Sequence, residues 1–243
     1  MDTGIPLLAL ALAACFLSGV HSATFTIQNH CSFTIWPALL TGAGPQLPST
    51  GFQLPSYAAR SLDVSAPWSG RVWARYLCSS SAGKFSCQSG DCASGQVACG
   101  GAGGIPPVTL AEFTLATGGG KDYYDVSIVD GFNLPVSVAP SGGNGRCSAT
   151  GCPADINRRC PPELAVENAD GGGAIGCKSA CLAFNQPQYC CTGAYNSPGT
   201  CKPTNYSLAF KQQCPESYSY AYDDKTSLFA CSGGPDYLIT FCP

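Results

Sequence analysis

The chain has 243 residues, of which 45% are hydrophobic and only 11% are charged, with a formal net charge of −3. So few charges among so many apolar residues exclude an intrinsically disordered chain, and the length allows one all-β domain with a core of its own. The longest basic cluster is the pair Arg158–Arg159, so neither nucleic acid nor an anionic membrane surface is an expected partner.

The chain begins with an apolar run from Leu7 to Val20. This run is too short to span a bilayer, and small residues follow it, so we interpret residues 1–22 as a signal peptide cleaved between Ser22 and Ala23. A rival reading is a bacterial lipoprotein site at Cys15, but no basic residues precede it and no polar tether follows. No other stretch approaches membrane-spanning length, so an integral membrane protein is not expected.

Seventeen cysteines are present, and cleavage would remove Cys15 and leave an even sixteen. Behind a secretory signal, such a set predicts up to eight disulfides formed in an oxidising compartment. The count does not assign the pairs. The adjacent residues Cys190 and Cys191 are nevertheless expected to bond elsewhere than to each other.

Short β-branched and aromatic runs, separated by Gly and Pro clusters, predict an antiparallel β-sandwich rather than alternating strands and helices. They fall mainly where cysteines are sparse. The predicted strands are Ala23–Asn29, Ser32–Trp36, Arg71–Tyr76, Thr109–Leu115, Tyr123–Val129 and Tyr237–Phe241.

The remaining segments have a different composition. Residues 83–104 and 142–176 are rich in small and turn-forming residues, so we expect disulfides to supply the constraint that their small apolar content cannot. The one helical candidate is Cys177–Phe184, in which Cys177, Cys181 and Phe184 share a face.

Several kinds of chemistry are disfavoured by the residues present. His30 is the only histidine left after cleavage, which is too little for a histidine-based hydrolase. A metal site is not expected because the thiolates would be consumed as disulfides. Gly118–Lys121 is followed by Asp122 instead of Ser or Thr, so it is not a phosphate-binding loop, and no cofactor is predicted.

Carboxylates offer the remaining candidate site. Glu112, Asp122, Asp125 and Asp130 lie on two consecutive predicted strands of a charge-poor chain. They fit either solvated strand ends or a cleft with paired carboxylates, the groups used in glycoside hydrolysis. Asp125 and Asp130 would face opposite sides of a straight strand, unless Asp130–Gly131 forms a turn.

An arginine between Arg71 and Arg75 is a natural counter-ion for Glu112, whose charge lies in mid-strand between Ala111 and Phe113.

Several motifs follow one another along the chain: Gly83–Cys92, Thr109–Phe113, Tyr124–Ser127, Val129–Pro135, Cys214–Tyr220 and Asp223–Asp224. In this order they resemble the thaumatin family. The resemblance spans Ala23 to Pro243 and includes the sixteen cysteines. The sequence departs from the family pattern at Ser89, where Thr is usual, and at Tyr76–Leu77 before Cys78.

The resemblance implies an all-β protein in three parts, forming one thaumatin-like domain over residues 23–243. These are a β-sandwich core (about 23–75, 102–151 and 214–243), a small loop lobe (about 76–101) and a disulfide-rich lobe with a short helix (about 152–213). It also implies eight disulfides: Cys31–Cys242, Cys78–Cys87, Cys92–Cys99, Cys147–Cys231, Cys152–Cys214, Cys160–Cys177, Cys181–Cys190 and Cys191–Cys201.

The resemblance further implies an acidic cleft between the core and the disulfide-rich lobe. Asp224 is the alternative for its fifth residue, and Tyr123, Tyr124 or Phe132 could stack on sugar rings. The cleft residues would be Arg71, Glu112, Asp125, Asp130 and Asp223.

The function that the resemblance implies is that of a secreted, monomeric antifungal plant defence protein of the apoplast that binds β-1,3-glucan of fungal walls. One alternative is a weak endo-β-1,3-glucanase, with Glu112 as general acid and Asp125 or Asp130 as nucleophile or base. Another is inhibition of a foreign glycosidase through the small loop lobe. Asn205 begins the only glycosylation sequon and would be a modification site.

Overall fold

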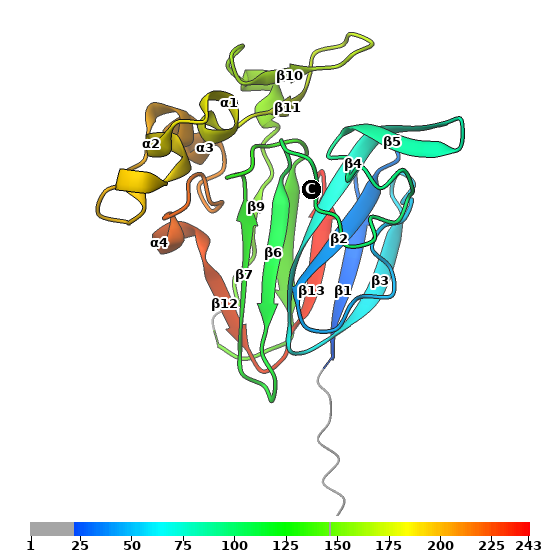
Figure 1. The fold of residues 1–243 in the computed structure, drawn as a ribbon. Helices are drawn as coiled ribbons and strands as arrows, with labels where there is room; N and C mark the ends of the chain where they lie inside the picture. The colour runs from blue at the N-terminus through cyan, green and yellow to red at the C-terminus, as the bar shows by residue number, and fades with distance from the viewer. Residues whose placement is uncertain (1–21, 146) are drawn as a thin grey trace, which may run out of the picture.

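The computed structural model describes residues 22–145 and 147–243. The predicted signal peptide, apart from Ser22, lies outside these residues, as does Cys15. Two β-sheets pack face to face as a sandwich, and short helices gather beside one end of it (Figure 1). Within the described residues, no helix is long and apolar enough to cross a membrane.

Both sheets are built from strands that are distant in sequence. The first sheet has the order β3 (Ala59–Ser65), β1 (Ser22–Asn29), β13 (Asp236–Phe241), β8 (Val136–Ser141) and β9 (Thr150–Cys152). The second has the order β12 (Phe229–Ser232), β7 (Lys121–Ser127), β6 (Leu110–Leu115), β4 (Trp68–Ser81) and β2 (Trp36–Ala43), and β5 (Lys84–Ser89) pairs with the far end of β4.

Aromatic side chains from the two sheets meet in the core. The ring of Phe25 on β1 lies 4.5 Å from that of Phe113 on β6 and 5.8 Å from that of Trp68 on β4. The rings of Phe113 and Tyr237 on β13 are 5.1 Å apart in an edge-to-face arrangement. One face of each sheet therefore lies in a shared core, as the predicted alternation of buried and outward residues requires.

The predicted strands in β1, β4, β6, β7 and β13 are confirmed. The strand predicted over Ser32–Trp36 is wrong, because β2 begins only at Trp36. The buried side chain of Asn29 explains the difference. It donates to the carbonyls of Phe33, Leu54 and Pro55, and its Oδ1 accepts from the amide of Cys31, so this segment bonds as a loop.

One strand pair departs from the antiparallel expectation. β1 and β13 run parallel, with Phe25 opposite Tyr237 and Asn29 opposite Phe241. The two strands therefore end at the same edge of the sheet, where the disulfide between Cys31 and Cys242 joins them.

The small loop lobe is fastened to the core by a fully buried arginine. Arg75 on β4 donates to the carbonyls of Trp36 (3.1 Å) and Val97 (2.6 Å), and its guanidinium lies 5.4 Å from the centre of the Phe85 ring. Burial lowers the pKa of Arg75 to about 10. Arg75 is therefore a structural cation, which leaves Arg71 as the counter-ion for Glu112.

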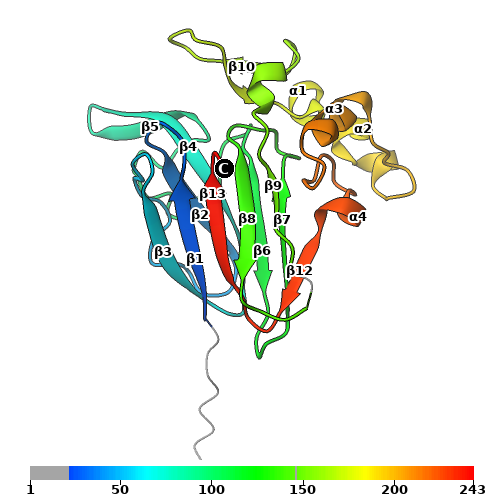
Figure 2. The same cartoon turned by 180° about the vertical axis from the view of Figure 1, so that it is seen from behind.

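The disulfide-rich lobe holds the hairpin of β10 (Ala165–Glu167) and β11 (Ala174–Cys177), and most of the helices. The helices are η1 (Ile156–Arg159), α1 (Ala180–Phe184), α2 (Pro187–Cys190), η2 (Gly193–Tyr195) and α3 (Asn205–Gln213), while α4 (Asp224–Ser227) follows the lobe. Figure 2 shows the hairpin above the sandwich, beyond the ends of β8 and β9.

Helix α1 differs from the sequence prediction in its start, and the other helices were not predicted. The predicted helix over Cys177–Phe184 starts at Ala180, because Cys177 belongs to β11 and Ser179 Oγ caps the helix by accepting from the Leu182 amide at 3.2 Å. Helix α3 was not predicted. Thr204 caps it in a reciprocal pair with Ser207, and this local signal is a capping box without the usual Glu or Gln.

Eight disulfides are present within the part of the chain that the structure describes. They are the pairs that the family resemblance implies, and Cys190 and Cys191 bond to different partners: Cys31–Cys242, Cys78–Cys87, Cys92–Cys99, Cys147–Cys231, Cys152–Cys214, Cys160–Cys177, Cys181–Cys190 and Cys191–Cys201.

Candidate functional site

Three charged residues form a row across the second sheet. Arg71 on β4 lies opposite Glu112 on β6, and Glu112 lies opposite Asp125 on β7. The next residues along these strands, Val72, Ala111 and Val126, are fully buried in the core. Since side chains alternate along a strand, the charged row lies on the outer face of the sheet.

A turn brings Asp130 to the same place. β7 ends at Ser127, and the Gly131 amide donates to the Ile128 carbonyl at 3.1 Å. Gly131 has φ +86°, and a Cβ there would lie 2.6 Å from Pro107 Cβ and 2.7 Å from the Cys177 carbonyl oxygen, so only glycine fits. The expected turn at Asp130–Gly131 therefore removes the alternation problem.

Arg71 reaches towards the carboxylate of Asp130, with 3.9 Å between Nη1 and Oδ2. Both side chains are more than 40% exposed, so the pair contributes little to stability. Its groups are consequently available to a ligand.

A loop before α4 forms the facing wall of the cleft. The Tyr218 amide donates to the Val126 carbonyl, and the Ile128 amide donates to the Tyr218 carbonyl, both at 2.9 Å. The loop thus pairs with the end of β7 like a short extra strand. The cleft has a volume of about 250 Å³ and is lined by Arg71, Leu110, Glu112, Asp125, Ser127, Val129, Asp130, Tyr218 and Ala221.

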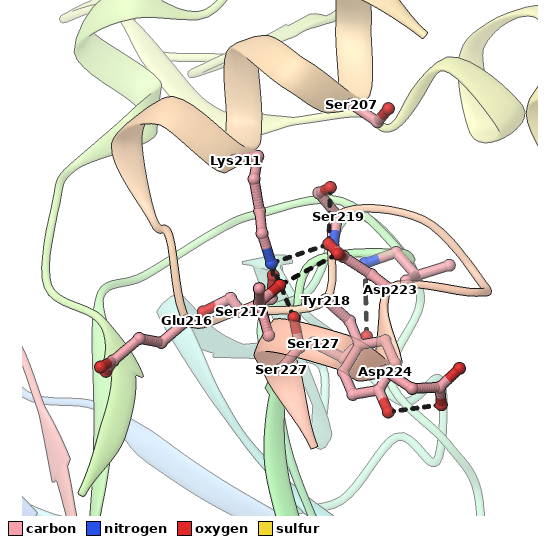
Figure 3. A network of polar contacts seen from close by, with 12 residues as sticks. Ser127, Ser207, Lys211, Glu216, Ser217, Tyr218, Ser219, Asp223, Asp224 and Ser227 are labelled. Carbon is pink, nitrogen blue, oxygen red and sulfur yellow. Dashed lines mark hydrogen bonds and ion pairs between the residues drawn. The ribbon is translucent and has the colours of Figure 1, made fainter. Parts of the chain in front are cut away.

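Asp223 is the one predicted cleft residue that does not line this cleft. Its Oδ2 lies 2.9 Å from Lys211 Nζ and accepts from the amide (3.1 Å) and hydroxyl (3.0 Å) of Ser219 (Figure 3). Lys211 also donates to the Ser217 carbonyl (3.0 Å) and to Ser227 Oγ (2.7 Å). Asp223 therefore ties the wall loop to helix α3.

Asp224, the alternative to Asp223, lies nearer to the cleft chemistry. Its Oδ1 accepts from the hydroxyl of Tyr218 at 2.8 Å, and Tyr218 lines the cleft (Figure 3). Its negative charge also acts on Asp125.

Crowding of carboxylates changes their protonation. Burial raises the pKa of Asp125 to about 8, and the charges of Glu112 and Asp224 add to the rise. Burial also raises the pKa of Glu112, where Arg71 opposes the shift and Asp130 adds to it. At neutral pH Asp125 is therefore mainly protonated and can donate a hydrogen bond.

The raised pKa of Asp125 makes a prediction about stability. Between about pH 4 and about pH 8 the folded chain keeps a proton that the unfolded chain loses, so this carboxyl lowers the free energy of unfolding progressively as pH rises. We expect Asp125→Asn to melt several degrees higher than the wild type at pH 8 and no higher at pH 4, measured by calorimetry.

Asp63→Asn, which changes an exposed carboxylate on β3, is the matched control and should give no pH-dependent gain. An Asp125→Asn variant whose melting temperature follows that of the wild type at every pH would contradict the assignment.

The other acid of the predicted cluster has a structural role. Asp122 is 3% exposed and accepts from the amide of Ala116 (2.8 Å) and the hydroxyl of Tyr237 (3.0 Å). It belongs to the end of the core and not to the cleft.

Two of the three aromatic residues expected to stack on sugars cannot do so. Tyr124 and Phe132 are fully buried, because their positions face the core. Tyr123 is 43% exposed and lies two residues from Asp125 on the same face of β7. Tyr123 is thus the aromatic ring available beside the acidic row.

Sequence reasoning missed the roles of Lys211 and Tyr218. Tyr218 lies in a family motif, but only the pairing with β7 turns it towards the acids. Lys211 is an isolated lysine on a short helix, and no local pattern indicates its partner.

The remaining candidates lie elsewhere. His30 is exposed after β1 and does not line the cleft. Asn205 is exposed at the first position of α3, while the Ser207 hydroxyl of its sequon is held in the helix cap. No group of three His, Cys, Asp or Glu residues suited to a metal ion occurs within residues 22–145 and 147–243.

The sequence is similar to a known family over most of its length. The family model described as the thaumatin family matches residues 29–243. Over 239 residues, the chain is 62% identical to thaumatin-like protein 1 of Pyrus pyrifolia. The aligned region covers 96% of this chain and 98% of that protein.

The chain is also 54% identical, over 245 residues, to a Prunus avium protein named glucan endo-1,3-beta-glucosidase, with 100% of each chain covered. Among solved structures, it resembles a laminaripentaose-producing β-1,3-glucanase in complex with laminaritetraose. The TM-score is 0.65 at 13% identity, over 92% of this chain and 99% of that one, which is a likeness of fold.

Proposed function

Because the chain belongs to the thaumatin family, we propose that it is a secreted plant defence protein that binds β-1,3-glucan of fungal walls in its acidic cleft. The observation that carries the proposal is the meeting of Arg71, Glu112, Asp125 and Asp130 in one cleft. The apoplast is the proposed location, and the eight disulfides suit that oxidising compartment.

The chemistry of the cleft suits a neutral sugar. Ionised carboxylates accept hydrogen bonds from sugar hydroxyls, while Arg71 and the protonated Asp125 donate. With Asp125 protonated and Arg71 positive, the negative charge of the row is small, so a neutral polymer is not disfavoured. Tyr123, beside the row, offers a face on which a pyranose ring can stack.

A second candidate function is weak hydrolysis of the same polymer, which the name of the Prunus avium relative favours. The raised pKa of Asp125 exchanges the roles expected from the sequence. Asp125 would serve as the general acid. Glu112, whose pKa burial also raises but whose ionised form Arg71 stabilises, would serve as nucleophile or base.

Retention on insoluble β-1,3-glucan tests the binding proposal. We expect Glu112→Gln and Asp125→Ala each to weaken binding by about tenfold to a hundredfold, because the first removes a charged acceptor and the second removes a hydrogen-bond donor. Asp125→Asn keeps a donating amide and should therefore still bind. Depletion of the protein from solution over a series of glucan concentrations gives the apparent Kd. The matched controls are Glu167→Gln and Asp63→Asn, which change exposed carboxylates outside the cleft.

A reducing-end assay on the same samples separates binding from hydrolysis. Release of sugar that is lost in Asp125→Asn supports the enzyme, whereas retention without release supports a binding protein. Unchanged retention in both Glu112→Gln and Asp125→Ala would overturn the cleft as the glucan site.

A further inference from the structure

A second and larger hollow lies between the small loop lobe and the disulfide-rich lobe, with a volume of about 800 Å³. We call it the aromatic groove. No residue lines both this groove and the acidic cleft. In Figure 2, β5 lies beside the end of β13 and β10 lies above it. Cys242, which follows β13, contributes to the groove.

Hydrogen bonds between the two lobes hold the groove open in one shape. The Tyr76 hydroxyl donates to the Ile175 carbonyl at 2.7 Å, across the floor. Gln88 on β5 donates to Asp170 Oδ2 at 3.0 Å and accepts from the Ala169 amide at 3.2 Å. The groove is therefore formed before any ligand arrives, as is usual for small-molecule sites.

Flat aromatic surfaces make up one side of the groove. The rings of Phe33 and Tyr76 lie 5.5 Å apart and only 30° from parallel, and Trp36 lines the same side. Phe33 is 41% exposed, although phenylalanine is usually buried. Tyr76 is buried behind the Phe33 ring, so the exposed ring of Phe33 is the surface that offers stacking to a planar molecule.

Leu77 is held in the groove at a conformational cost. Its φ of +52° lies in the left-handed region, and its side chain is 40% exposed. Both conditions are unfavourable for leucine: Gly or Asn adopts this backbone conformation more readily, and the apolar side chain is exposed to water. Tyr76–Leu77 is also the segment where this sequence departs from the family pattern. A ligand that covers Leu77 would account for its presence.

The charges that line the groove cancel. Arg158 Nε and Asp155 Oδ2 form an ion pair at 3.1 Å, and the other polar side chains there, Thr34, Asn157 and Asn168, are neutral. A charged ligand would lose hydration without meeting an opposite unpaired charge. The lining therefore favours a neutral ligand with hydroxyl groups at its edges.

We propose that the aromatic groove binds a neutral, flat, mainly apolar small molecule of the phenolic class, independently of glucan. One ring stacks on the exposed ring of Phe33, which Tyr76 supports from behind, Leu77 packs on the molecule, and the hydroxyl groups meet Thr34 and Asn168 at the rim. The volume suits a molecule with two linked rings.

Titration calorimetry with resveratrol, a neutral two-ring phenol, tests the proposal on the secreted, fully oxidised chain. We expect one site, with binding at least about tenfold weaker in Leu77→Asn and in Phe33→Ala, because each removes a large apolar contact. Leu77→Asn keeps the backbone conformation, since Asn tolerates positive φ. Unfolding curves of both variants verify that they fold.

Tyr57→Asn is the matched control, because Tyr57 is also exposed (76%), has φ +59° and lies outside the groove. Its affinity for resveratrol should equal that of the wild type. The proposal is overturned if resveratrol does not bind, if all three variants bind alike, if laminaritetraose competes, or if anionic cinnamate binds equally well.

Discussion

Replacement of Lys211 by Met should lower the free energy of unfolding by about 3 kcal/mol and weaken retention on glucan. Lys211 and Asp223 are 19% and 12% exposed, and their ion pair joins α3 to the wall of the acidic cleft (Figure 3). Removing Lys211 leaves the mostly buried charge of Asp223 with hydrogen bonds from Ser219 but without its counter-ion, and breaking such a pair typically costs about 3 to 5 kcal/mol. Urea denaturation without reductant measures the first effect, and depletion by insoluble glucan the second.

The double variant Lys211→Met/Asp223→Asn provides the test of mechanism. It removes the Asp223 carboxylate that Lys211→Met leaves without a counter-ion. We therefore expect it to recover part of the lost stability, while retention on glucan stays weak. Lys225→Met changes an exposed lysine on α4 and should behave as the wild type. A Lys211→Met variant with unaltered stability would show that the pair does not hold the wall.

Most strands that alternate and lie inside a sheet were predictable, but β8, which lies between β13 and β9, was not. Phe25 and Ile27 alternate with Thr24 and Thr26, and this alternation alone is enough to identify β1. β3 was not predicted, because it is the edge strand of the first sheet, and its outer residues, such as Arg60 and Asp63, are polar. Its hydrophobic signal is correspondingly weak.

The parallel pairing of β1 and β13 could not be read from local patterns. Each strand alternates equally well in either direction, and their partnership joins the two ends of the chain. Only the implied disulfide between Cys31 and Cys242 indicated that these ends meet. The pattern within one strand does not identify a partner strand that is distant in the sequence.

The acidic cleft was predictable only in the parts that depend on local signals. Glu112 is conspicuous because a charge in mid-strand needs an explanation, and the Asp130–Gly131 turn follows from glycine's conformational freedom. The role of Asp223 depends instead on Lys211, twelve residues earlier on a helix in another lobe. No spacing rule connects them, so an acid expected in the cleft is found holding its wall.

Asp125 shows how function and stability oppose each other in this cleft. Its Oδ1 is buried without a hydrogen-bond partner, and its pKa is raised by burial and by neighbouring acids. An asparagine would avoid the ionisation penalty. Retention of an acid at such a position is typical of a site selected for binding or catalysis rather than for stability.

Removal of the disulfide between Cys31 and Cys242 should produce the largest loss of stability of any single bridge. The two cysteines are 211 residues apart, and they fasten the ends of the parallel strands β1 and β13. A bridge that closes so long a loop restricts the unfolded chain strongly, and its loss costs about 5 kcal/mol on the loop-entropy relation. For a chain of this size, that corresponds to a fall in Tm of about 10 to 20 °C.

The Cys31→Ala/Cys242→Ala variant should be compared with Cys78→Ala/Cys87→Ala. Cys78 and Cys87 are only nine residues apart and already face each other in the β4–β5 hairpin, so their bridge should contribute about half as much. Guanidinium unfolding without reductant measures both losses, after mass spectrometry has verified the other seven bridges. Equal losses would mean that local packing, rather than the length of the closed loop, sets the contribution of each bridge, and that the junction of the chain ends is not what keeps the sandwich closed.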